Sequence, residues 1–144
     1  MDQQGVIEFR SANVLHAIVV RRPAPGTVRF ATPCDAPLQV GVLDRPEGHQ
    51  VAAHVHAAEP LTVVAGSEFL YVESGRIRLE LFDEEWNELG VCELSAGDHI
   101  VLFRCGHAVT MLEPTRLIEV RQGPLAAAGP QKRFRNDVVS GAQQ

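Results

Sequence analysis

Residues 48–75 read GHQVAAHVHAAEPLTVVAGSEFLYVESG, and this stretch decides both the fold and the candidate site. It holds two histidines two positions apart, His54 and His56, and a glutamate, Glu68, at the start of an expected strand. Side chains alternate between the two faces of a strand, so a strand through the histidine pair would place both imidazoles on one face. Imidazole and carboxylate together form the ligand set of a borderline divalent metal ion.

Glu68 is the preferred carboxylate ligand. In the expected strand 68–73 it shares a face with Leu70 and Val72. A carboxylate on an apolar face is costly to bury unless something pairs with it. Glu59 lies nearer to the histidine pair and stays open as the alternative ligand. No strand is expected directly after Glu59, so we favour Glu68.

A third histidine, His107, follows the turn at Cys105-Gly106 and begins the expected strand 107–112. Three imidazoles and one carboxylate leave coordination positions open and suit a divalent transition metal: Zn, Ni, Fe, Mn or Co. A lone histidine is more often a core or surface residue than a ligand. We interpret the other histidines in that way: His16, His49 and His99.

The remainder of the chain consists of short apolar or alternating runs separated by turns rich in Gly, Pro and Asp. The expected strands are 14–20, 27–31, 38–43, 68–73, 76–82, 88–94, 99–103, 107–112 and 117–121. Ser74-Gly75 between two of these runs is a short hairpin signal. No helical periodicity is long enough for a major helix. This pattern predicts an all-β protein, a closed barrel or jelly roll.

Composition narrows the function classes. The 144 residues fit a single domain, with 45% hydrophobic and 22% charged residues. Thirteen basic against eighteen acidic residues give a net charge of −5, which argues against a nucleic-acid or acidic-membrane partner. No apolar run approaches the roughly 18 residues of a membrane span.

The cysteines and the amino terminus indicate a cytoplasmic protein. The chain has three cysteines, an odd number, with no CxxC spacing: Cys34, Cys92 and Cys105. This argues against a disulfide framework or a cysteine-rich zinc site. The first residues, MDQQGVIEF, have neither the basic nor the apolar region of a secretory signal.

Two motifs resemble those of the cupin superfamily. The first runs from Gly48 over five residues to His54-Val55-His56, then to Glu68, six further residues and Gly75. The second begins at Gly97-Asp98 and closes at His107. The resemblance covers roughly residues 38–121 and implies a double-stranded β-helix, a jelly-roll barrel. It also implies that the two histidines of the first motif, its glutamate and His107 hold one metal ion.

The chain departs from the superfamily pattern in two places. Eleven residues separate His56 from Glu68, a longer gap than is usual, so the intervening loop is enlarged. In the second motif Phe103 stands where proline is usual and Cys105 precedes Gly106, with the turn one residue short. The end of the chain, from Leu117 through Gly123-Pro124 to Lys132-Arg133-Phe134, is similar to that of small stand-alone bacterial cupins linked to polysaccharide or sugar biosynthesis.

Several functions fit such a site. The first is a protein that binds or acts on a small polar molecule, such as a sugar derivative, through its ion. The alternatives are a non-haem metal-dependent dioxygenase or isomerase and a non-catalytic ligand-binding module. An enzyme needs a proton-transfer group near the ion. The candidates are Tyr71, Arg76, Glu119 and Arg121, although for each of them we favour a solvated or salt-bridged strand residue. Cys105 is a secondary ligand, a redox-sensitive thiol or a small buried hydrophobe, and we favour the last.

The expected organisation is one barrel domain over residues 1–125, followed by an arm or frayed tail over 126–144. The apolar runs 14–20 and 27–31 precede the motif core. They can complete the chain's own barrel, or they can pair with another subunit's sheet. We expect a homodimer.

Overall fold

The computed structural model describes residues 5–56, 66–121 and 135 of the chain. These residues form an all-β structure of antiparallel sheets, as the sequence predicts. The expected arm over 126–144 lies outside the described residues except for Arg135. No helix in the described part of the chain has the length and apolar character needed to cross a membrane.

Each of the nine expected ranges contains a strand, and one further strand, β1, was not expected. The bounds are β1 Val6–Ser11, β2 Val14–Val20, β3 Val28–Phe30, β4 Gly41–Leu43, β5 Glu68–Ser74, β6 Arg76–Phe82, β7 Glu88–Ser95, β8 His99–Leu102, β9 Gly106–Met111 and β10 Arg116–Arg121. The strand expected through His54 and His56 is wrong, because residues 49–56 carry no strand.

β1 forms a hairpin with β2 through Ala12 and Asn13. Both turn residues have positive φ angles, 46° and 66°, as a tight two-residue hairpin turn requires. Asparagine tolerates this region better than most residues, so Asn13 ahead of an apolar run was the available sequence signal. β1 has no buried residue and mixes polar with apolar residues. Its sequence therefore lacks the apolar run that marks the other strands.

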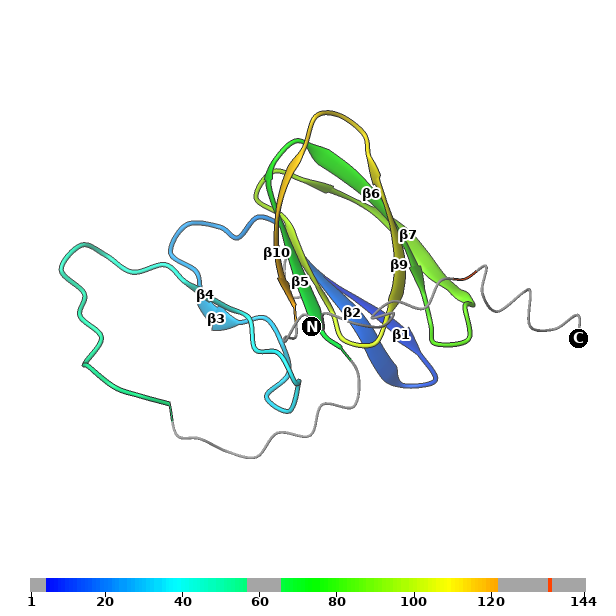
Figure 1. Ribbon diagram of the computed structural model, residues 1–144. Helices are drawn as coiled ribbons and strands as arrows, with labels where there is room; N and C mark the ends of the chain where they lie inside the picture. Colours follow the sequence, from blue (N-terminus) through cyan, green and yellow to red (C-terminus); the bar gives the residue numbers. More distant parts are fainter. Residues whose placement is uncertain (1–4, 57–65, 122–134, 136–144) are drawn as a thin grey trace, which may run out of the picture.

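The strands form two main sheets and one small ribbon (Figure 1). The five-stranded sheet has the order β1-β2-β8-β5-β10, and the three-stranded sheet has the order β7-β6-β9. β3 and β4 pair with each other in a separate ribbon. β2 pairs on both sides, with β1 and β8, so the run 14–20 completes its own sheet and has no free edge for a second subunit.

The hairpin expected at Ser74-Gly75 is wrong. β5 pairs with β8 and β10, whereas β6 pairs with β7 and β9, so the chain changes sheets at this point. Gly75 has a φ angle of 87°, and a side chain there would collide with Thr115 and the carbonyl of Pro114. Residues 114–115 therefore pack against the position where the chain passes from one sheet to the other, and this close approach requires glycine at position 75.

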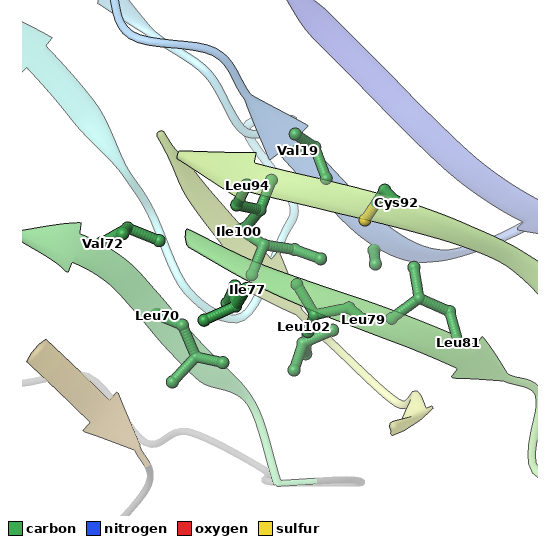
Figure 2. Close-up of a cluster of buried hydrophobic side chains, with 11 residues drawn as sticks. Val19, Leu70, Val72, Ile77, Leu79, Leu81, Cys92, Leu94, Ile100 and Leu102 are labelled. Atoms are coloured by element: carbon green, nitrogen blue, oxygen red, sulfur yellow. The ribbon is translucent and has the colours of Figure 1, made fainter. Parts of the chain in front are cut away.

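One apolar core joins the inner faces of the two sheets (Figure 2). The five-stranded sheet contributes alternate residues of β5 and β8, and the three-stranded sheet contributes alternate residues of β6 and β7. The buried members are Ala17, Val19, Leu70, Val72, Ile77, Leu79, Leu81, Cys92, Leu94, Ile100 and Leu102. Two antiparallel sheets packed through such a core are compatible with a β-sandwich.

A second apolar core covers the outer face of the five-stranded sheet. Residues 31–40 lie over Ile18, Val20, Val101 and Phe103. β2 and β8 are therefore buried on both faces, which explains why their sequences are nearly continuous apolar runs rather than alternating ones.

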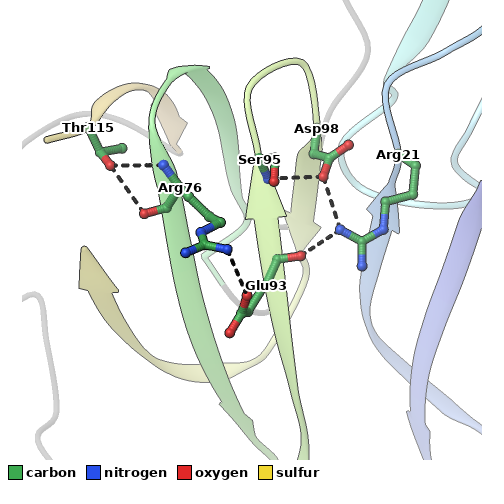
Figure 3. A network of polar contacts seen from close by, with 6 residues as sticks. All are labelled: Arg21, Arg76, Glu93, Ser95, Asp98 and Thr115. Atoms are coloured by element: carbon green, nitrogen blue, oxygen red, sulfur yellow. Dashed lines mark hydrogen bonds and ion pairs between the residues drawn. The ribbon is translucent and has the colours of Figure 1, made fainter. Parts of the chain in front are cut away.

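Asp98 ties the end of β2 to the turn between β7 and β8 (Figure 3). Its carboxylate accepts hydrogen bonds from the backbone N–H of Ser95 at 3.0 Å and of Arg22 at 2.8 Å, and from the Arg21 guanidinium at 2.9 Å. Gly97, with a φ of 93°, leaves room for the stem of Arg22, which a side chain would meet at 2.8 Å. Asp98 is buried, so removing its carboxylate leaves several donors without their acceptor.

We predict that Asp98→Ala lowers the free energy of unfolding by about 2–3 kcal/mol, because hydrogen bonds to a buried charged group are lost. Urea denaturation of both proteins measures the difference. The control is Glu93→Gln. The Glu93 carboxylate is exposed and makes only a long contact, 3.9 Å, with Arg76, so this variant should change the free energy of unfolding by less than about 0.5 kcal/mol. Equal effects of the two substitutions would contradict the role of Asp98.

Candidate metal centre

Glu68 begins β5 and faces the interior of the sandwich. Its cross-strand partners are Leu102 on β8 and Arg121 on β10, and Leu102 belongs to the inner core. The alternation expected from the sequence is confirmed, because Leu70 and Val72 of the same face are buried in that core. The side chain of Glu68 remains 22% exposed, so it lies at the rim of the core rather than in its centre.

His107 lies on the opposite sheet and faces Glu68. Its cross-strand partner on β6 is Leu81, another inner-core residue, so the imidazole also points inward. The Nε2 atom of His107 is 3.6 Å from the Oε2 atom of Glu68. Two residues that are far apart in the sequence thus meet at one end of the interior.

The other ring nitrogen of His107 sets the orientation of the imidazole. Nδ1 lies 3.3 Å from the carbonyl oxygen of Cys105, to which the tautomer protonated on Nδ1 can donate. In that tautomer the lone pair lies on Nε2, the ring nitrogen that faces Glu68. A histidine ligand commonly has its second nitrogen bound to a carbonyl in this way.

The turn before His107 is supported by Trp86, which sequence reasoning missed. The Asp83 carboxylate accepts from the backbone N–H groups of Glu85 at 3.0 Å and Asn87 at 2.9 Å. A hydrogen bond from the Asn87 side chain, followed by these backbone bonds, holds the pKa of Asp83 below its ordinary value. Trp86 in this turn has a positive φ of 68° and lies so close to Gly106 that a side chain there would meet its ring at 3.0 Å. Asp followed four residues later by Asn was the available signal.

His54 and His56 lie away from the other two candidates. Their rings are neighbours, with centroids 5.2 Å apart, and the Nδ1 atom of His54 is 2.8 Å from the carbonyl oxygen of Ala52. Both side chains are exposed, in a segment that extends from the β3–β4 ribbon away from the sheets (Figure 1). Among residues 5–56 and 66–121, no three His, Cys, Asp or Glu side chains are grouped to hold an ion. Glu59 lies outside the described residues.

Two of the proposed proton-transfer candidates lie beside Glu68. Arg121 is its direct cross-strand partner, and Glu119 is the partner of Leu70, so both face inward. The Arg121 guanidinium is 3.5 Å from the Glu119 carboxylate, and both side chains are exposed. The inward position expected for this pair on one face of the last strand is confirmed.

Tyr71 and Arg76 do not reach Glu68. Tyr71 pairs with His99 across the sheet and so lies on its outer face, which contains the second core. Arg76 begins β6 at the opposite end of the sandwich and lies 3.9 Å from the Glu93 carboxylate (Figure 3). Neither residue is placed to transfer a proton at the Glu68–His107 pair.

Cys105 packs against the inner core beside the turn that carries His107. Its thiol donates to the carbonyl oxygen of Gly106 at 3.3 Å, and burial raises the pKa of the thiol to about 11. The neutral thiol therefore predominates near pH 7, whereas metal ligation and oxidation require the thiolate. These features favour the small buried hydrophobe among the three roles considered.

His16, His49 and His99 lie in the core or on the surface, as the sequence predicts. His49 is exposed, whereas His16 and His99 are buried. His99 lies on the outer face of β8, with its ring centroid 5.4 Å from that of Phe69. Its Nε2 atom has no hydrogen-bond partner among the described residues. Burial lowers the pKa of His99 below its ordinary value of 6.5, and the charge of Asp98 only partly opposes this.

Comparisons with protein-family models, with curated proteins and with solved structures found no match for the chain. The account of the site therefore depends on the residues themselves.

The buried His99 predicts a pH dependence of stability. Its pKa is lower in the folded protein, so below pH 6.5 the unfolded chain binds a proton that the folded chain does not. The free energy of unfolding should therefore fall as the pH drops from 6.5, by at most about 1.4 kcal/mol per pH unit. Urea denaturation between pH 7.5 and pH about 5.5 measures this slope. His99→Leu should flatten it, while the exposed control His49→Gln should not; an unchanged slope in His99→Leu would contradict the assignment.

Proposed function

We propose that the protein holds one divalent transition-metal ion with His54, His56, Glu68 and His107. The ion, one of Zn, Ni, Fe, Mn or Co, lies within a cupin-type jelly-roll barrel. At its open positions it binds a small polar molecule, such as a sugar derivative.

The observation that carries this proposal is the approach of Glu68 to His107. A carboxylate oxygen and an imidazole nitrogen face each other at 3.6 Å on the inner faces of two sheets. A metal cation between these two atoms would satisfy both of them. Two ligands about 2.1 Å from a tetrahedral ion lie roughly 3.4 Å apart, close to the observed separation. A proton on Nε2 would also satisfy the pair, and the metal analysis below separates the two possibilities.

The resemblance to the cupin superfamily supports the other two ligands. Both of its motifs occur in order, and their third and fourth ligand positions are the two residues that face each other. The Gly97-Asp98 pair of the second motif stabilises the turn before β8 through the contacts of Asp98. His54 and His56 occupy the remaining ligand positions of the first motif, although they lie apart from the pair in this structure.

Arg121 and Glu119 support a polar ligand. Both are exposed and lie on the inner face of β10 beside Glu68. A divalent ion together with the two carboxylates and one guanidinium leaves one net positive charge at the site. Such a site suits a ligand with hydroxyl or oxyanion groups, since guanidinium binds carboxylate and phosphate oxygens well.

Two alternative functions remain, and the identity of the ion separates them. Redox-active iron would favour the dioxygenase reading, in which the ion activates dioxygen at an open position. Zinc or nickel beside Arg121 and Glu119 would favour isomerase chemistry or simple binding. Glu119 can accept a proton, and it lies one inward-facing position along β10 from Arg121, the cross-strand partner of Glu68. It is therefore the preferred proton-transfer residue.

We also propose a homodimer. The run 14–20 is paired within its own sheet, so the candidate contact is the β3–β4 ribbon. Val28, Phe30 and Leu43 are 43%, 61% and 60% exposed, and the register places them on one face of this ribbon. Light scattering that gives the mass of a single chain would contradict the dimer.

We predict that the purified protein contains about one equivalent of a divalent transition metal, and that His54→Ala with His107→Ala lowers this content at least roughly tenfold. Elemental analysis after gel filtration measures the content. Glu68→Gln should also lower it, because a neutral amide replaces the charged ligand.

His49→Ala provides the matched control, since His49 lies in the same exposed segment as His54 but outside the proposed ligand set. Its metal content should equal that of the unaltered protein. If the double variant retains the same content as well, the ion is held elsewhere or not at all, and the proposed site is wrong.

A further inference from the structure

Phe82 is a buried aromatic residue that belongs to neither apolar core. It ends β6 and is 8% exposed, yet both cores consist of other residues. Two of its neighbours lie in turns. The ring centroid of Trp86 is 6.1 Å from that of Phe82, and a side chain on Gly106 would meet the Cβ atom of Phe82 at 3.3 Å. A large apolar ring outside the cores is removed from water only if something else covers it.

Part of this cover is Arg135, the one described residue beyond position 121. Its guanidinium carbon lies over the Phe82 ring, 5.1 Å from the ring centroid. A guanidinium over an aromatic face within about 6 Å is attracted by the quadrupole of the ring. The two residues are far apart in the sequence, so this contact brings the C-terminal segment back to the turn between β6 and β7.

The charges on the two sides of this contact are opposite. Residues 83–88 read DEEWNE, with four acidic and no basic residues, whereas residues 132–135 read KRFR, with three basic residues. Glu84, Glu85 and Glu88 of the turn are exposed. Arg104 lies 3.8 Å from Glu84, so it is close to one of these carboxylates. Opposite charges attract over about a Debye length, about 8 Å at physiological ionic strength.

We propose that the turn 82–88 is a docking surface for the C-terminal segment of its own chain, and that Arg135 is the anchor of this segment. The guanidinium lies on Phe82, and the exposed carboxylates of the turn attract the basic run that ends at Arg135. Docking covers Phe82, which together with Trp86 flanks Gly106, the residue before His107. Of the two descriptions considered for residues 126–144, an arm and a frayed tail, the proposal selects the arm. It does not depend on a bound ion.

Energy transfer from Trp86 to a label beside Arg135 tests the docking. Trp86 is the only tryptophan of the chain and lies within the proposed surface, so it is the sole tryptophan donor. The acceptor is attached to a cysteine introduced as Asn136→Cys, and the exposed Cys34 is replaced by serine. The whole chain is used after EDTA treatment, so that the result does not depend on the proposed ion. Donor lifetimes separate docked from undocked chains, and their amplitudes give the docking constant.

Most donors should have the short lifetime of a docked chain, because the acceptor is next to the anchor in the sequence. Arg135→Gln should lower the docking constant about fivefold, since it removes the cation over the ring, and Arg135→Lys should restore part of the loss. The matched control is Arg116→Gln. It makes the same change of charge at an exposed arginine that pairs with Glu73, and it should leave the docking constant unchanged.

A long donor lifetime in the labelled parent protein would overturn the docking. If Arg135→Gln lowers the docking constant no more than Arg116→Gln does, Arg135 is not the anchor. To identify the chain that supplies the segment, acceptor-labelled protein with Trp86→Phe is refolded together with an excess of unlabelled protein. No transfer is expected in this mixture. Transfer there would place the segment on a second copy and overturn docking within one chain.

Discussion

The apolar core between the two sheets is the constraint on which the candidate site depends. Leu70 and Val72 of β5 pack in the same core as Leu79 and Leu81 of β6. This packing fixes the separation and register of the sheets, and β6 in turn fixes β9 through its cross-strand pairs. Glu68 and His107 meet because each stands at the rim of this core on its own sheet. The turn held by Asp98 and the sheet crossing at Gly75 maintain the same arrangement from the other end.

Local patterns predicted much of this fold. Apolar runs bounded by turn residues located nine strands, and period-two alternation placed Glu68 on the inner face before any pairing was known. Sheet membership was not predictable in this way. Ser74-Gly75 has the composition of a hairpin, but whether two successive strands pair depends on contacts with distant residues such as Thr115. Similarly, the turn at 83–87 showed only charge, whereas its role is to place Trp86 against Gly106.

The histidine pair is the strongest local signal and the one whose placement is least determined by local sequence. Both histidines lie in an exposed segment that carries no strand, so no packing against the apolar core fixes their position.

The central claim is that one ion is held by imidazoles from both motifs together with Glu68. X-ray absorption at the edge of the bound metal tests it most directly, because outer-shell scattering counts imidazole rings. The account predicts nitrogen and oxygen ligands at about 2.0–2.2 Å and the scattering of about three imidazoles. A single imidazole, or a sulfur ligand at about 2.3 Å contributed by Cys105, would contradict it.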